Sequence, residues 1–246
     1  MNISLELIPN SEEHLINEMA MIKADFPMIT AINIPDLARF DMRSWDACTL
    51  VKNEFPRAIP HLRAIDFNYS EDLPFKSTLL DYDINEVLVL KGDPPQDMSK
   101  KVYTTCSVDM IYKIKREMPH VKVYAAIDQY RHSMKDEYEY VQHKLNAGVD
   151  GFFTQPFFDI RFLEMYTEML SGIEIYFGLS PVTSKLSASY WKAKNNVVFP
   201  KGFESTYKWN IEFAKKAIEY ISMNEGNVYF MPIVVDLKRY LTGVFS

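Results

Sequence analysis

The chain has 246 residues, 48% of them hydrophobic, and a formal net charge of −6 at pH 7. This length and composition predict one soluble, enzyme-sized domain over residues 1–246, with a single core. The negative charge argues against a general nucleic-acid binder, and no run reaches the ~18 apolar residues of a membrane span. Two cysteines without CxxC spacing, and no visible signal peptide, predict a reduced cytoplasmic protein.

Eight apolar runs of strand length follow one another along the chain, and most end in polar residues. The first ends near Glu6. The fourth ends in Lys91-Gly92-Asp93, where Pro94 and Pro95 forbid its continuation. The runs cover residues 3–9, 28–33, 59–66, 87–90, 121–127, 151–154, 173–179 and 228–235.

Helical spacing of apolar residues predicts helices between these runs. Asp159 can cap one of them, and Ser133 with Asp136 resembles a capping box at the start of another. Residues 194–206 read as an irregular excursion. The helical segments are 11–24, 44–55, 71–82, 104–118, 133–147, 159–171 and 206–222. Eight alternations predict an α/β fold, a single (β/α)8 TIM barrel, with an open doubly wound sheet as the alternative.

Several familiar catalytic motifs do not occur in this sequence. There is no GxGxxG, Walker loop, HExxH or GxSxG. The five histidines lack metal-ligand spacing, so we expect no metal site. The remaining candidates are polar residues at strand ends, which a barrel brings together on one face.

A set of short motifs in chain order gives the sequence a family resemblance. It resembles the methylenetetrahydrofolate reductase family, the flavoprotein barrel of one-carbon metabolism and methionine biosynthesis. The fourth-strand and sixth-strand motifs are the most specific of the set. The motifs are Ser4–Pro9, Pro60-His61-Leu62, Leu90-Lys91-Gly92-Asp93-Pro94-Pro95, Lys144–Asp150, Thr154-Gln155-Pro156-Phe157-Phe158-Asp159 and Gly178–Val182.

The resemblance implies an FAD-dependent reductase that converts 5,10-methylenetetrahydrofolate to 5-methyltetrahydrofolate, with NADH or NADPH as electron donor. Glu6 takes the role of general acid, and its apolar neighbours favour a raised pKa. Asp93 is the expected carboxylate that stabilises the iminium cation. Gln155 suits a pterin edge, and Trp191 or Tyr190 provides an aromatic ring for the substrate or the nicotinamide.

The resemblance also implies a set of cofactor contacts. Backbone amides around Gly92, with Lys91, are expected to face the flavin diphosphate. The full set is Asn33, His61, Leu90, Lys91, Gly92, Asp93, Tyr103, Thr104, Ala126, Asp128, His132 and Lys144.

Each assignment has a structural alternative. Glu6 can be a strand-edge carboxylate, and Asp93 can cap the turn before Pro94. Gln155 can satisfy backbone groups, while His61 and the Tyr190-Trp191 pair can belong to the core.

Two other functions remain open. One is a flavin-free barrel that binds folate or a methylated pterin, as a methyl-transfer component or a partner of a reductase. Two observations favour it. Asp128, Tyr140 and His143 offer a diphosphate little positive charge, and the last strand lacks the arginine that the resemblance leads us to expect there. The other is a flavin reductase for a smaller imine or carbonyl. The short segment after the last strand predicts an uncovered flank, and therefore a homo-oligomer or a partner subunit.

Overall fold

The computed structural model describes residues 1–37, 40, 42–94 and 101–246, and shows a closed barrel of eight parallel strands in sequential order. Pro95 of the fourth-strand motif lies outside the described residues. β1 pairs with both β2 and β8, so the barrel prediction is confirmed and the open-sheet alternative is wrong. The strands are β1 (Ile3–Glu6), β2 (Ala31–Ile34), β3 (Arg57–Arg63), β4 (Glu86–Leu90), β5 (Lys122–Ile127), β6 (Gly151–Pro156), β7 (Ile175–Leu179) and β8 (Asn227–Phe230).

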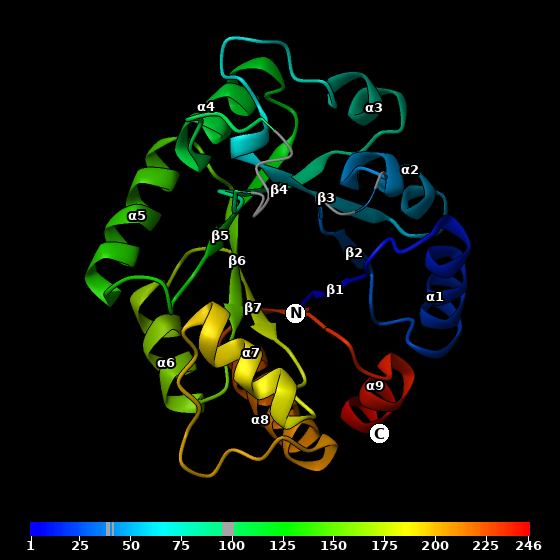
Figure 1. Ribbon diagram of the computed structural model, residues 1–246, viewed down its shortest axis with the longest axis vertical. Coiled ribbons are helices and arrows are strands. Elements are labelled where there is room, and N and C mark those ends of the chain that lie inside the picture. The colour runs from blue at the N-terminus through cyan, green and yellow to red at the C-terminus, as the bar shows by residue number, and fades with distance from the viewer. Residues whose placement is uncertain (38–39, 41, 95–100) are drawn as a thin grey trace.

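Helices surround the strands (Figure 1), and every segment predicted to be helical contains one. The segment at 71–82 gives only a short helix. Among the described residues, no helix has the length and apolar character to cross a membrane. The helices are α1 (Glu12–Asp25), α2 (Ser44–Glu54), α3 (Lys76–Asp81), α4 (Ser107–Glu117), α5 (Met134–Asn146), α6 (Ile160–Met169), α7 (Lys185–Asn195), α8 (Tyr207–Met223) and α9 (Leu237–Phe245), with a 3-10 turn at Ala64–Asp66.

Side-chain caps fix where several helices begin. The Ser133 hydroxyl accepts a hydrogen bond from the Asp136 amide at 3.2 Å and donates to the Asp136 carboxylate at 2.7 Å. The predicted cap of α5 is therefore present. The Asp136 carboxylate, however, accepts from the hydroxyl of Ser133, whereas in a capping box it would accept from the backbone amide. Asp159 accepts from the Arg161 amide at 3.0 Å and starts α6 as predicted. Such caps satisfy amide groups that have no partner inside the helix.

The alternation of side chains along each strand divides the barrel interior from its outer shell. Outward residues such as Leu5, Leu62 and Phe177 belong to the large apolar core under the helices. The inward residues of the middle layer form a smaller cluster rich in aromatic rings. It contains Ala31, Ile59, Leu88, Tyr124, Phe153, Tyr176, Tyr229 and Met231, with Leu90 packed against it. Polar inward residues are thereby left to the two ends of the barrel.

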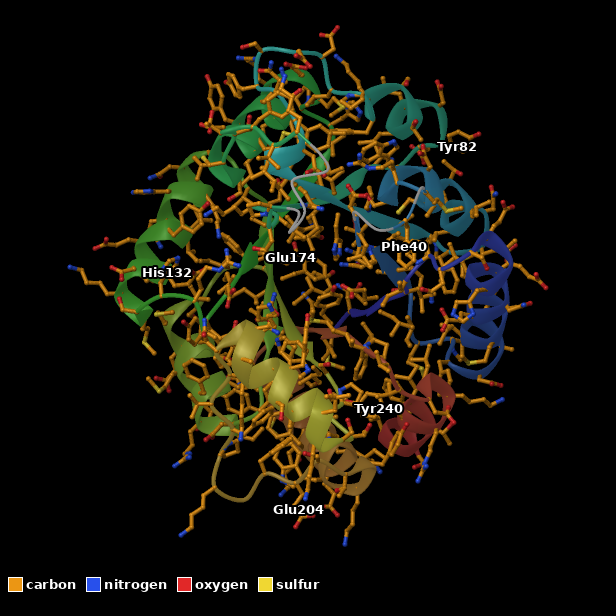
Figure 2. The ribbon with its side chains drawn as sticks, viewed as in Figure 1. Phe40, Tyr82, His132, Glu174, Glu204 and Tyr240 are labelled. Carbon is orange, nitrogen blue, oxygen red and sulfur yellow. The ribbon has the colours of Figure 1, made fainter. Side chains whose placement is uncertain are left out.

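The segment after β8 forms α9, which covers the flank predicted to be open. Tyr240, labelled in Figure 2, and Phe245 pack on Phe230 with ring centroids 6.1 and 5.8 Å away. Lys238 forms an ion pair with Asp25 at 2.7 Å, which ties α9 to the end of α1. The predicted homo-oligomer or partner subunit rested on this flank and remains an untested expectation.

Candidate active site

Glu6 lies at the carboxyl end of β1 and points into the barrel. It is 9% exposed, and burial raises the pKa of its carboxyl group to about 7. The hydroxyl of Tyr229, from the neighbouring strand β8, donates a short hydrogen bond to Oε2 of Glu6, which opposes part of this rise. Half of the Glu6 carboxyl groups therefore carry a proton near neutral pH, as a general acid requires.

A chain of hydrogen bonds through Asn33 sets the direction of the Tyr229 donor. Ser4 donates to Oδ1 of Asn33 at 2.6 Å, and Nδ2 of Asn33 lies 3.3 Å from Nε2 of His61. Asn33 also hydrogen-bonds Tyr229. Because burial lowers the pKa of His61 to about 3, its imidazole is neutral and accepts from the amide. The amide NH2 therefore faces Tyr229 and His61, and the phenol proton is left to Glu6.

A cavity of about 680 Å³ opens at the carboxyl ends of β3, β4, β5 and β6. Val89, Leu90 and Ala126 give it an apolar wall. Leu90 also packs against the inner cluster, whereas Glu6 and Tyr229 are not among the described residues that line the cavity. Nine predicted site residues line it: Leu90, Lys91, Gly92, Asp93, Ala126, Asp128, His132, Lys144 and Gln155. Figure 2 labels His132 on the β5–α5 side.

Carboxylates accompany most of the cations in this cavity. Arg131 lies 3.2 Å from Asp128 and 3.8 Å from Asp93. Lys144 donates to the carbonyl oxygen of Ala126 at 2.6 Å and lies 3.9 Å from Glu137. The anions Asp36 and Asp136 also line the cavity. Positive charge is thus present, but neighbouring acids neutralise most of it.

The buried pair Lys144 and Glu137 is held with both groups poorly solvated. Burial lowers the pKa of Lys144 to about 8 and raises that of Glu137, in spite of the attraction between the two charges. Glu137 also accepts a hydrogen bond from the amide of Asp128 at 3.1 Å, which fixes the turn after β5. This pair thus holds the β5 end of the cavity in place.

Asp93, which follows β4, and Gln155, on β6, both line this cavity. The side chain of Asp93 is 89% exposed, at the rim. Gln155 is half-buried, and its backbone oxygen accepts from Nε2 of Gln129 at 2.7 Å. Gln155 lines the cavity, and none of the hydrogen bonds within the described residues occupies its side-chain amide.

Four predicted contacts lie away from the residues that line the cavity. Trp191 is 2% exposed in an apolar cluster with Phe158, which matches its core-packing alternative, and Tyr190 is 52% exposed on α7. Tyr103 donates its amide hydrogen to the carbonyl of Ile65 at 2.7 Å, and Thr104 is exposed. The structure therefore brings these four to neither Glu6 nor the cavity lining.

Several residues of the site were not predicted from the sequence, among them Tyr229, Arg63 and Glu137. The inward orientation of Tyr229 and Arg63 could be predicted from the sequence. Side chains alternate along a strand between the barrel interior and its outer shell, and both residues fall on inward positions. Arg63 follows Arg57, Ile59 and His61 along β3 and lines the cavity. For Glu137, buried on the inner face of α5, the sequence offered no signal beyond its place in the first turn.

Comparison with solved structures agrees with the barrel. Oxaloacetate acetylhydrolase superposes with a TM-score of 0.61 at 10% identity, over 98% of this chain and 78% of that chain. The 2,3-dimethylmalate lyase superposes with a TM-score of 0.55 at 8% identity, over 99% and 88%. At this identity the likeness concerns the fold alone, because many chemistries share this barrel.

Comparison by sequence identifies the family. A 5,10-methylenetetrahydrofolate reductase of Pectobacterium carotovorum subsp. carotovorum is 25% identical over 148 residues, which are 58% of this chain and 50% of the relative. The match therefore spans about half the length of that relative. The family model for methylenetetrahydrofolate reductase matches residues 1–228. This match covers most of the sequence, and the chain belongs to the methylenetetrahydrofolate reductase family.

Proposed function

We propose that the protein reduces 5,10-methylenetetrahydrofolate to 5-methyltetrahydrofolate, with FAD as cofactor and NADH or NADPH as electron donor. The observation that carries the proposal is Glu6. It is a desolvated carboxyl group at the carboxyl end of a barrel strand, and its pKa of about 7 lets it hold a proton at neutral pH.

The reaction needs a hydride at the bridging carbon and a proton at the nitrogen that leaves it. Glu6 supplies that proton. Its Oε2 accepts from Tyr229, so the carboxyl proton resides on Oε1 and is free to move to the substrate nitrogen. Transfer leaves a carboxylate that Tyr229 stabilises, and a proton from solvent restores the acid. Gln155 presents an amide that can donate to and accept from a pterin edge.

The cavity suits a flavin in size and lining. Its volume is within the range of small-molecule sites, and Val89, Leu90 and Ala126 offer apolar surface to a ring system. Lys144, His132, Lys91 and the backbone at Gly92 are the groups that would hold the cofactor. A bound flavin would supply the hydride, and the surrounding wall would keep water from the reacting carbon.

A flavin-free barrel that binds folate or a methylated pterin is the second candidate. The specific observation in its favour is the pairing of cavity cations by acids. Arg131 faces Asp128 and Lys144 faces Glu137, which reduces the positive charge available to a diphosphate. In this role the barrel would act in methyl transfer, or as a partner of a reductase.

The visible absorption spectrum of the purified protein separates the two candidates. We expect flavin bands that persist after addition of FAD and desalting. We also expect bleaching by NADH or NADPH, followed by reoxidation with methylenetetrahydrofolate. A colourless protein that binds methyltetrahydrofolate would favour the second candidate and contradict the first.

A further inference from the structure

Arg63 is a buried arginine at the carboxyl end of β3 whose hydrogen bonds are incomplete. It is 8% exposed, and its Nε is buried without a hydrogen-bond partner among the residues that the structure describes. Its Nη2 donates to the backbone oxygen of Asp93 at 2.5 Å. A buried donor without a hydrogen-bond partner destabilises the folded protein. A ligand that brings an acceptor to this guanidinium therefore binds more tightly.

The surrounding backbone is shaped to hold this guanidinium at the cavity wall. Gly92 has a φ of +83°, and a Cβ at that position would lie 3.0 Å from both Cβ and Nε of Arg63. Only glycine combines this backbone conformation with the close approach. The guanidinium therefore lies against the turn after β4, beside Lys91, where the sequence predicted a cationic contact for a diphosphate.

Arg63, like Lys144, has a backbone oxygen and a carboxylate close by, but its carboxylate is shared with a second cation. Asp66 approaches its Nη2 only to 3.6 Å, and the same carboxylate lies 3.3 Å from Arg43. Arg43 is in turn held by Asp36 at 2.6 Å. Lys144 donates to a carbonyl oxygen at 2.6 Å and lies 3.9 Å from Glu137, and no second cation of the described residues forms an ion pair with that carboxylate. The charge of Arg63 is thus the one that an anion would complete.

We propose that Arg63 is the anchoring cation of this cavity and that it binds an oxyanion of the ligand. The oxyanion is a phosphate of a dinucleotide or a carboxylate of a folate tail, since both present acidic oxygens to a guanidinium. The inference rests on the cavity of the proposed function as the ligand site. It adds the residue that holds the ligand there, and ligand binding by Arg63 can be measured without any catalytic reaction.

Calorimetric titration with three probes tests the proposal. ADP carries the diphosphate without a flavin ring, p-aminobenzoylglutamate carries the carboxylates without a pterin, and riboflavin carries a flavin ring without phosphate. We expect Arg63→Met to weaken one oxyanion probe by roughly tenfold or more, and to leave riboflavin unchanged. The affinity of Arg63→Lys for that probe should lie between those of the wild type and Arg63→Met, because lysine retains the positive charge but cannot form the two parallel hydrogen bonds of a guanidinium. Loss with ADP assigns the phosphate, and loss with p-aminobenzoylglutamate assigns the carboxylate.

Arg57→Met and Arg57→Lys are matched controls. Arg57 is on the same strand and the same inward phase, but at the other end of the barrel. These variants should bind every probe as the wild-type chain does. Where a Met variant fails to fold, the two Lys variants make the same comparison. Equal affinity of the wild-type and Arg63 variants for both oxyanions overturns the proposal, and so does a wild-type chain that binds neither. A protein without folate reduction that still loses oxyanion binding on Arg63→Met contradicts only the proposed function.

Discussion

The two ends of the barrel interior both contain buried charged residues, but these residues are paired at one end and incompletely paired at the other. At the amino-terminal end, Arg57 donates to both carboxylate oxygens of Glu86 at 3.0 Å and to the hydroxyls of Tyr176 and Tyr124. Glu174 accepts from Lys122 at 2.7 Å. At the carboxyl-terminal end, Glu6 has no cation within ion-pair distance in the described part of the chain, and Arg63 has an unpartnered donor.

The difference separates a cation that stays in one protonation state from a carboxyl group that can exchange a proton near neutral pH. Burial and pairing with Glu86 act in opposite directions on the pKa of Arg57, with a net rise, so this cation is charged at every physiological pH. Burial without a counter-charge brings the pKa of Glu6 close to neutrality. A group held in one protonation state can only bind, whereas a group near its pKa can also transfer a proton.

The largest effect should come from removing the acid. Glu6→Gln keeps the shape of the side chain and loses the proton, so we expect folate reduction to fall by roughly 100- to 10,000-fold. Reduction of bound flavin by the nicotinamide should continue at the wild-type rate. Stopped-flow measurement of the two half-reactions checks this, and equal loss in both would contradict the acid role.

The corresponding change at the other end should affect stability and spare catalysis. Glu86→Gln leaves Arg57 without its counter-charge, and we expect a loss of about 3 kcal/mol in the free energy of unfolding. The rate of folate reduction should be unchanged. Urea denaturation and a steady-state assay on the same sample measure both, and a large loss of activity in the folded variant would break the comparison.

Glu6→Gln should also stabilise the protein above neutral pH. The pKa of Glu6 in the folded protein, about 7, lies above the ordinary value of 4.5 for a glutamate. Its contribution to stability is therefore complete below pH 4.5 and is lost as the pH rises through 7. The variant should gain up to about 3 kcal/mol over the wild type by pH 8, with the gap opening between pH 4.5 and 7. The contribution of His61 to the pH dependence of stability is the same in both proteins and cancels in the difference between them. A constant gap would show that Glu6 is not desolvated.

A smaller effect should come from Tyr229→Phe. The phenol lowers the pKa of Glu6 by donating to it. Its removal should shift the alkaline fall in folate reduction upward by roughly one pH unit, with Glu6 still active as an acid. The pH profile of kcat measures the shift. An unchanged profile would mean that Tyr229 contributes only packing.

The sequence allowed the barrel to be predicted, because apolar runs of strand length and the helical spacing between them are local properties, and it placed nine of the predicted site residues along one cavity. Glu6 was found from its apolar neighbours. The inward position of Tyr229 on its strand could be predicted, but its contact with Glu6 could not, since that contact joins residues 223 positions apart and depends on closure of the barrel. For Trp191 the sequence left two interpretations open, because an aromatic residue after β7 can serve a ligand or a core equally, and the structure places it in an apolar cluster at 2% exposure.

The most direct test of this account is the pKa of the Glu6 carboxyl group in the folded protein. A ¹³C NMR titration of the glutamate side chains, with Glu6→Gln to assign the signal, would measure it. The account predicts a midpoint near 7, and a further upward shift in Tyr229→Phe. A midpoint near 4.5 in both proteins would contradict the desolvation of Glu6, and with it the role of Glu6 as the proton donor.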